Sequence, residues 1–212
     1  MKINEIFYSI QGESSFAGCP CAFIRLTACD LRCTYCDTGY AFYEGREMSV
    51  PEILRAIQPY PTRLVLVTGG EPMLQKEVHD LFRALLDLNY TVCVETGGHI
   101  SLRDVNKRVR KIMDLKCPSS GMQSRNDLSN IETLTRGDEI KFVIGDRADF
   151  EWACEMTRRF ELPSRVGAVL FSPVYGSLPY DLLAAWVLES GLPVRMQIQL
   201  HKIIWPGVLR GV

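Results

Sequence analysis

Short apolar stretches rich in β-branched residues recur along this chain, and amphipathic stretches of helical period separate several of them. The apolar stretches predict strands at residues 22–27, 64–68, 91–95, 111–115, 139–144, 168–171 and 194–199. The amphipathic stretches predict helices at residues 51–58, 75–88, 148–160 and 180–189, with a capping box of Ser49 and Glu52 at the first. Near-continuous apolar strands that alternate with helices are typical of a parallel sheet covered by helices.

The length of the chain limits which fold this pattern can form. The strand–helix order favours a barrel-like or doubly wound fold, but a closed eight-fold barrel typically takes about 250 residues, and this chain has 212. We therefore predict an α/β fold, an incomplete (β/α) barrel of about six parallel strands with an N-terminal extension, forming a single domain over residues 1–212. Residues 96–110 are too few for a long crossover helix, and the polar residues 117–138 indicate a mobile loop.

The composition excludes several classes of protein. Hydrophobic residues make up 47% of the chain and charged residues 23%, with a net charge of −1, so neither a nucleic-acid-binding surface nor a disordered chain is indicated. No apolar run reaches the roughly 18 residues that a membrane-spanning helix needs, and the N-terminal residues do not resemble a secretory signal. We expect a cytoplasmic protein that binds neither membranes nor nucleic acid.

Most of the polar signals follow predicted strands. The segment "TACDLRCTYCDT" follows the first strand, "TGGEP" the second, "ETGG" the third and "DLK" the fourth. In parallel α/β folds the carboxyl ends of the strands meet at one edge, where ligands bind. Four such segments therefore predict one binding site at that edge.

Three of the eight cysteines, Cys29, Cys33 and Cys36, follow the spacing C-x3-C-x2-C. A structural zinc site closes with four ligands, and a cubane iron–sulfur cluster normally takes four cysteines. With three cysteine ligands, one iron remains open to a substrate or cofactor, which is a catalytic arrangement. Of the other cysteines, Cys93 and Cys154 fit apolar core positions, whereas the roles of Cys19, Cys21 and Cys117 stay open.

The cysteine triplet, with Tyr35 before its last member, resembles the signature of the radical S-adenosylmethionine superfamily. "TGGEP" at residues 68–72 resembles the GGEP motif of that superfamily, whose glycines let the backbone approach the amino-acid group of the cofactor. "EIFYSIQGES", "FIRLTACDLRCTYCDT", "QLHKIIW" and the terminal "RGV" are similar to 7-carboxy-7-deazaguanine synthases over nearly the whole chain.

That resemblance implies an incomplete (β/α) barrel and an enzyme of deazapurine and queuosine biosynthesis. Such a lyase converts 6-carboxy-5,6,7,8-tetrahydropterin into 7-carboxy-7-deazaguanine with loss of ammonia. It uses a 4Fe–4S cluster, S-adenosylmethionine and Mg²⁺, and a 5′-deoxyadenosyl radical takes a hydrogen from C6 of the substrate. The resemblance also implies a homodimer and an electron donor such as flavodoxin or ferredoxin.

The resemblance assigns roles to individual residues. Cys29, Cys33 and Cys36 would bind the cluster and Thr38 would bind Mg²⁺. The residues implied to contact S-adenosylmethionine are Tyr35, Cys36, Asp37, Gly70, Glu71, Glu95, Lys116 and Ser172. Those implied to contact the substrate are Ile10, Gln11, Gly12, Glu13, Arg25, Thr68 and His201, which we place at the end of the last strand. His79 and His99 lack such a context and are predicted to be solvated.

One departure and two alternatives qualify these assignments. Many relatives carry a serine-proline-lysine stretch where this chain has "DLK", which weakens the transfer to Lys116. One alternative is an activase that takes hydrogen from a glycine of a partner protein, but "QGE" and the threonine of "CDT" argue for a small substrate. The other is a zinc-binding nucleic-acid module, which would need a fourth metal ligand and a basic face.

Overall fold

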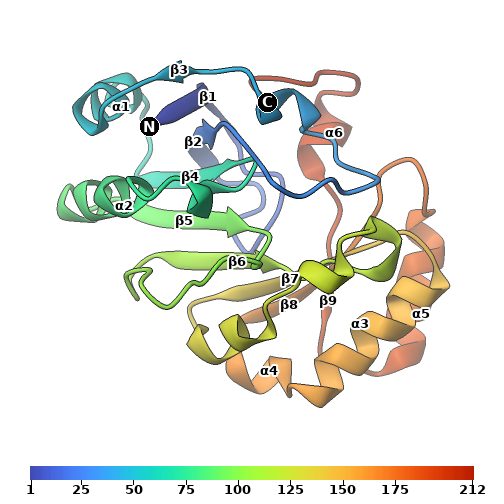
Figure 1. Ribbon diagram of the computed structural model, residues 1–212. Helices are drawn as coiled ribbons and strands as arrows, with labels where there is room; N and C mark the ends of the chain where they lie inside the picture. The colour runs from blue at the N-terminus through green and yellow to red at the C-terminus, as the bar shows by residue number, and fades with distance from the viewer.

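A computed structural model describes residues 1–212, and its centre is one nine-stranded sheet (Figure 1). The strand order is β3-β1-β2-β4-β5-β6-β7-β8-β9. The strands are β1 (Lys2–Ile10), β2 (Pro20–Leu26), β3 (Arg46–Glu47), β4 (Leu64–Gly69), β5 (Thr91–Thr96), β6 (Arg110–Asp114), β7 (Glu139–Ile144), β8 (Ala168–Pro173) and β9 (Arg195–Met196).

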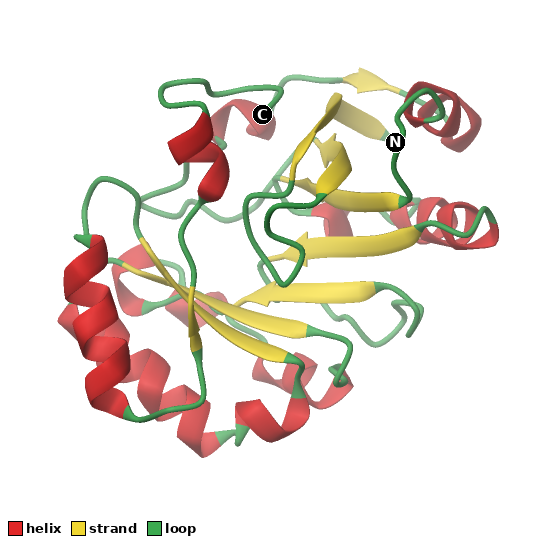
Figure 2. Ribbon diagram, turned by 180° about the vertical axis from the view of Figure 1, so that it is seen from behind, coloured by secondary structure: helices red, strands yellow, loops and turns green.

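Helices cover the outer side of this curved sheet (Figures 1 and 2). The α-helices are α1 (Val50–Ile57), α2 (Val78–Asp87), α3 (Arg147–Arg159), α4 (Leu162–Arg165), α5 (Tyr180–Ser190) and α6 (Leu200–Ile204). The 3-10 helices are η1 (Gly39–Phe42), η2 (Pro72–Leu74), η3 (Pro118–Ser120), η4 (Gln123–Arg125) and η5 (Leu128–Thr133). The four predicted helices are confirmed, as is the capping box of Ser49 and Glu52. None of the helices combines the length and apolar character that a bilayer crossing requires.

The sheet confirms the predicted incomplete barrel. From β2 to β9 neighbouring strands are parallel, whereas β1 pairs antiparallel with both β2 and β3. The outermost strands β3 and β9 do not pair with each other, so the barrel stays open. The N-terminal extension is therefore a strand, β1, that the sequence analysis did not predict. The last predicted strand, residues 194–199, was too long, because only Arg195 and Met196 pair with β8.

The two faces of the sheet bury different side chains. The outer face and its helices enclose a hydrophobic core of 38 buried residues. Along each strand the side chains alternate between faces, and the inner face carries a second cluster of seven: Phe7, Cys21, Phe23, Leu64, Leu66, Cys93 and Ile112. Two positions further along the strands, the inner face becomes polar, with Arg25, Thr68, Glu95 and Asp114. The inside of the open barrel is thus apolar at one end and charged at the end where the predicted site lies.

The stretch 117–138, which its polar composition indicated to be a mobile loop, contains short helices and buried residues. It forms η3, η4 and η5, and Asn130 and Ile131 within it are buried. The Asn130 amide donates to the carbonyls of Gly98 and Ile100 at 3.0 and 2.8 Å, and its oxygen accepts from the Leu102 N–H at 2.7 Å. One side chain therefore satisfies three backbone groups of the β5–β6 connection, which contains no helix, as predicted.

Candidate active site

The cysteine loop and the glycine loop lie against each other at the carboxyl edge of the sheet. The Gly70 N–H donates to the Leu26 carbonyl at 3.2 Å, and the Glu71 N–H donates to the Ala28 carbonyl at 2.7 Å. A Cβ atom on Gly70 would lie 2.1 Å from the Ala28 carbonyl oxygen, so only glycine allows this approach. The predicted meeting of the "TACDLRCTYCDT" and "TGGEP" segments is present in the structure.

The three thiols of the cysteine loop are free and accessible. Cys29 and Cys33 are half-buried and Cys36 is exposed. Burial raises the pKa of the Cys29 and Cys33 thiols, while the Lys116 ammonium acts in the opposite direction at Cys33. The loop is fixed by Tyr35, whose hydroxyl donates to the Val143 carbonyl of β7 at 3.3 Å.

This thiol arrangement suits a cluster better than a single ion. The loop offers three free thiols, whereas a structural zinc site closes with four ligands. A cubane takes one thiolate at each of three irons, and therefore accepts thiols that are spread along a loop. The cysteine loop fits a cluster with one open iron.

Glu71 of the glycine loop is a structural anchor in this conformation. Its carboxylate accepts from the Met73 N–H at 3.0 Å, the Thr96 hydroxyl at 2.8 Å and the Gly97 N–H at 2.8 Å. Burial raises the pKa of this carboxyl group. The contact of Glu71 with the cofactor stays a prediction, while its side chain joins the ends of β4 and β5.

His99 was predicted to be solvated, and this is wrong. Its side chain is only 2% exposed, and its Nε2 atom lies 2.6 Å from the Asp30 carboxylate next to Cys29. Arg125 of η4 binds the other oxygen of Asp30 at 2.8 Å. A lone histidine carries no periodic signal, so its burial between two loops was not predictable from the sequence.

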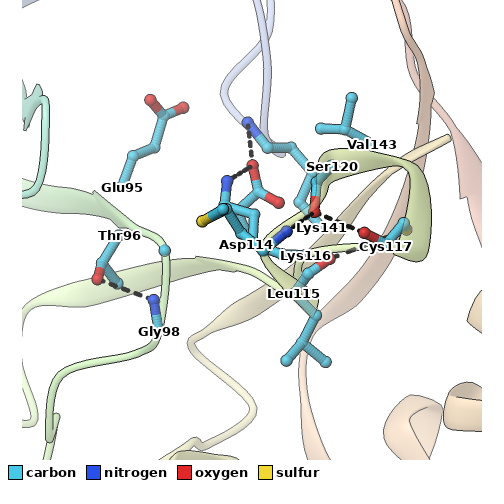
Figure 3. Close-up of polar contacts among 12 residues, drawn as sticks. Glu95, Thr96, Gly98, Asp114, Leu115, Lys116, Cys117, Ser120, Lys141 and Val143 are labelled. Carbon is cyan, nitrogen blue, oxygen red and sulfur yellow. Dashed lines mark hydrogen bonds and ion pairs between the residues drawn. The ribbon is translucent and has the colours of Figure 1, made fainter. Parts of the chain in front are cut away.

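A cluster of buried charges lies on the inner face beside these loops (Figure 3). The Lys141 ammonium lies 2.7 Å from Glu13 Oε2, and Gln199 donates to the other oxygen of Glu13 at 2.8 Å. Lys116 and Lys141 approach the same oxygen of Asp114, at 3.0 and 3.8 Å (Figure 3). Lys141 was missed by the sequence analysis, although a lysine inside the apolar strand "EIKFVI" was a usable signal.

The charges in this cluster stabilise one another. Burial alone would lower the pKa of Lys141, but the carboxylates of Glu13, Glu95 and Asp114 raise it well above the ordinary value. Burial likewise opposes ionisation of Glu13, yet the Lys141 ammonium holds the pKa of Glu13 below its usual value. Burial raises the pKa of Glu95, whose carboxylate accepts from the Thr68 hydroxyl at 3.0 Å. Glu13 is therefore a buried anion in a polar cluster.

The "QGE" loop after Ile10 packs against α6. The Leu200 N–H donates to the Gly12 carbonyl at 3.0 Å, and a Cβ atom on Gly12 would lie 2.1 Å from His201 Nδ1. Gln11 is buried, and its side-chain oxygen accepts from the Glu13 N–H at 3.2 Å. His201 lies on α6 rather than at the end of a strand, and burial lowers its pKa. The structure thus brings together predicted residues from opposite ends of the chain.

Arg25 on β2 faces the same interior. Its Nε atom donates to Glu5 Oε1 at 2.8 Å, and Tyr40 donates to the same oxygen at 3.0 Å. The guanidinium also lies over the Phe7 and Tyr40 rings, at 5.8 and 5.9 Å from their centroids. Arg25 is held from one side by these contacts, and neither of its terminal nitrogens donates a hydrogen bond to the protein.

Two predicted ligands remain: Ser172, which would contact S-adenosylmethionine, and Thr38, which would bind Mg²⁺. The Ser172 hydroxyl is buried on β8 without a hydrogen-bond partner, which suits contact with a polar cofactor. Thr38 donates to Asp37 at 2.9 Å. Partial desolvation would raise the pKa of the Asp37 carboxyl, but the ammonium of Lys202 on α6, with which it is paired, lowers that pKa. A magnesium ion here would take the Thr38 hydroxyl and several waters or substrate oxygens, as this ion prefers.

The chain is similar to known proteins over its whole length. Residues 23–163 match the model of the Radical SAM superfamily. A 7-carboxy-7-deazaguanine synthase from Koribacter versatilis is 46% identical over 227 residues, covering 100% of both chains. The enzyme of that name from Chlorobaculum tepidum is 45% identical over 216 residues, covering 100% of this chain and 97% of its own.

Solved structures support the fold. QueE from Escherichia coli aligns with a TM-score of 0.73 at 23% identity, covering 94% of each chain. SuiB from Streptococcus suis aligns with a TM-score of 0.56 at 14% identity, covering 87% of this chain and 53% of its own. None of these named relatives is an activase of glycyl-radical enzymes or a zinc-binding nucleic-acid module. The chain belongs to the 7-carboxy-7-deazaguanine synthase family of the Radical SAM superfamily, whose cofactors are a 4Fe–4S cluster and S-adenosylmethionine.

Proposed function

We propose that this chain converts 6-carboxy-5,6,7,8-tetrahydropterin into 7-carboxy-7-deazaguanine with loss of ammonia. The observation that carries the proposal is the buried Glu13 carboxylate, held by Lys141 and Gln199 on the inner face of the barrel. A pterin edge presents ring and amino N–H groups side by side, and an ionised carboxylate is the acceptor that matches them. A site built around such a buried acceptor discriminates strongly against molecules that lack the donors.

The other predicted substrate residues complement this contact. The free terminal nitrogens of Arg25 suit a bidentate pair with the substrate carboxylate. His201 has a lowered pKa, so at neutral pH its imidazole is uncharged and can donate or accept one hydrogen bond. Gln11 and Gly12 lie beside Glu13, and the His201 ring packs against Gly12 so closely that no side chain fits there.

The cofactors supply the radical chemistry and the protein supplies binding and orientation. When bound, the cluster and S-adenosylmethionine provide the radical that takes hydrogen from C6 of the substrate. Cys29, Cys33 and Cys36 would hold the cluster, and the glycine loop, Glu95, Lys116 and Ser172 would hold S-adenosylmethionine. Tyr35, Cys36 and Asp37 of the cysteine loop would also contact S-adenosylmethionine.

The proposal also covers the domain organisation, cellular location, oligomeric state and electron donor of the enzyme. We expect one Radical SAM domain over residues 1–212 that works in the cytoplasm as a homodimer. An electron donor such as flavodoxin or ferredoxin would reduce the cluster, and the exposed Cys36 shows that the cysteine loop lies near the surface. The product would enter deazapurine and queuosine biosynthesis.

The direct test is anaerobic incubation of the reconstituted protein with S-adenosylmethionine, a low-potential reductant and the carboxytetrahydropterin. We expect a deazaguanine with a carboxyl group at C7 and an equal amount of ammonia, both detected by mass spectrometry and enzymatic assay. Product formation should require all three additions. A protein that cleaves S-adenosylmethionine but leaves the pterin intact would refute the proposed substrate.

Replacement of Thr38 tests the proposed magnesium site. In Thr38→Ala the Mg²⁺ concentration for half-maximal product formation should rise about 10- to 100-fold, the usual effect of losing a metal-site group. Thr38→Ser keeps the hydroxyl and should respond as the wild type does, and the iron content of both variants should stay unchanged. If the Mg²⁺ titration is the same in Thr38→Ala and Thr38→Ser, this residue does not bind the ion.

A further inference from the structure

Lys141 connects the predicted substrate loop to the centre of the sheet. It lies on β7 in register with Asp114 of β6, and its side chain is 10% exposed. Its ammonium lies 2.7 Å from Glu13 Oε2, a contact between residues 128 positions apart in the sequence. The site residues that the sequence analysis identified do not include it.

Stability alone is a poor explanation for this buried cation. Buried ion pairs often contribute little to folding, because desolvation offsets the attraction between the charges. Lys111 on the outer face forms an ion pair that serves the structure alone. Its ammonium donates to the Val109 carbonyl at 3.4 Å and lies 3.0 Å from the Asp138 carboxylate. That carboxylate also accepts from the N–H and the hydroxyl of Thr135. Both carboxylate oxygens of Asp138 therefore have hydrogen-bond donors. Around Lys141, by contrast, Asp114 Oδ1 is buried without a hydrogen-bond partner.

The ammonium of Lys141 retains donors that the protein does not use. A lysine ammonium has three N–H donors. Glu13 takes one, and the 3.8 Å distance to Asp114 Oδ2 is too long for a hydrogen bond. Two N–H groups therefore remain for an acceptor beside Glu13. A pterin carries its ring carbonyl close to the ring N–H donors that suit the Glu13 carboxylate.

We infer that Lys141 is a substrate-positioning residue, which rests on the proposed function and deepens it. It keeps Glu13 ionised and in place against the N–H edge of the pterin, and it donates to the adjacent ring carbonyl. A neutral side chain at this position would leave the Glu13 carboxylate buried without its cation. Substrate binding should then weaken more than binding of S-adenosylmethionine, whose predicted contacts Glu95 and Lys116 are neighbours of Lys141.

Lys141→Met and the matched control Lys111→Met test this inference, since each removes one buried ammonium from a carboxylate partner. The measurement is substrate titration of product formation, with 5′-deoxyadenosine release in the absence of substrate as the cofactor readout. In Lys141→Met the substrate KM should rise about 10- to 150-fold, the effect of losing a hydrogen bond to a charged group. Its 5′-deoxyadenosine release should fall much less than KM rises, because the predicted S-adenosylmethionine contacts Glu95 and Lys116 are neighbours of Lys141 and stay in place; a fall in release as large as the rise in KM would overturn the inference. Lys111→Met should lower the melting temperature and leave KM unchanged.

Two further variants separate positioning from folding. Lys141→Gln keeps a neutral donor for Glu13, so it should be more stable than Lys141→Met and have a KM between those of wild type and Lys141→Met. In a Glu13→Gln background, Lys141→Gln should raise KM less than it does in the wild type, because the partner charge is gone. An unchanged KM in Lys141→Gln would overturn the inference while the proposed function stands. Absence of product from the wild type would overturn both.

Discussion

Cys33→Ala is expected to abolish both iron–sulfur content and cleavage of S-adenosylmethionine. The three thiols of the loop are free, and a cubane that has lost one of three protein ligands exposes two irons instead of one. The effect should be loss to the assay background, and Cys29→Ala and Cys36→Ala should behave alike. The measurements are iron and sulfide content after anaerobic reconstitution, and 5′-deoxyadenosine formation with a low-potential reductant.

Cys93→Ala is the matched control for this prediction. Cys93 is 1% exposed on the inner face of β5, within the apolar cluster, and burial raises the pKa of its thiol. Its replacement removes one buried sulfur and should cost about 1 kcal/mol of folding free energy, a usual value for a point substitution. Iron content and 5′-deoxyadenosine formation should be retained. A Cys33→Ala protein with the iron content and activity of Cys93→Ala would refute the cluster assignment.

The sequence predicted the parallel part of the fold because its strands are buried on both faces. Residues 64–68 and 91–95 are nearly continuous apolar runs, a pattern that sheet burial on both faces produces. Strand β1 was missed because "KINEIFYSI" mixes charged and apolar residues without clean alternation. Its Glu5 is paired inside the barrel with Arg25, and that pairing depends on a partner 20 residues away.

The predicted site was incomplete for a related reason. Motifs identify residues whose neighbours in sequence carry the signal, such as the cysteines and the glycines. Lys141 and His99 owe their positions to Glu13 and Asp30, which lie 128 and 69 positions away in the chain. Burial of a charged or titratable side chain becomes acceptable only when such a partner is present. The sequence alone does not show which distant groups will meet.

Arg25→Ala is expected to weaken substrate binding by about 30-fold to several thousandfold, as loss of one partner of a buried charge pair typically costs about 2–5 kcal/mol. In the structure Glu5 holds the Nε atom of Arg25 and Tyr40 supports Glu5, so the guanidinium is fixed before any ligand arrives. Its two terminal nitrogens remain to bind both oxygens of the substrate carboxylate. Preorganisation of this kind lowers the entropy cost of binding.

Arg25→Lys distinguishes a carboxylate clamp from a structural ion pair. A lysine at this position can still pair with Glu5 and preserve the fold, but its ammonium is a point charge that cannot bind a carboxylate in the bidentate manner. Substrate affinity should therefore recover little in Arg25→Lys, while the melting temperature recovers. 5′-Deoxyadenosine release without substrate should persist in both variants, since it does not involve the substrate carboxylate. Wild-type substrate affinity in Arg25→Ala would show that the arginine serves only its pair with Glu5 and that another residue holds the carboxylate.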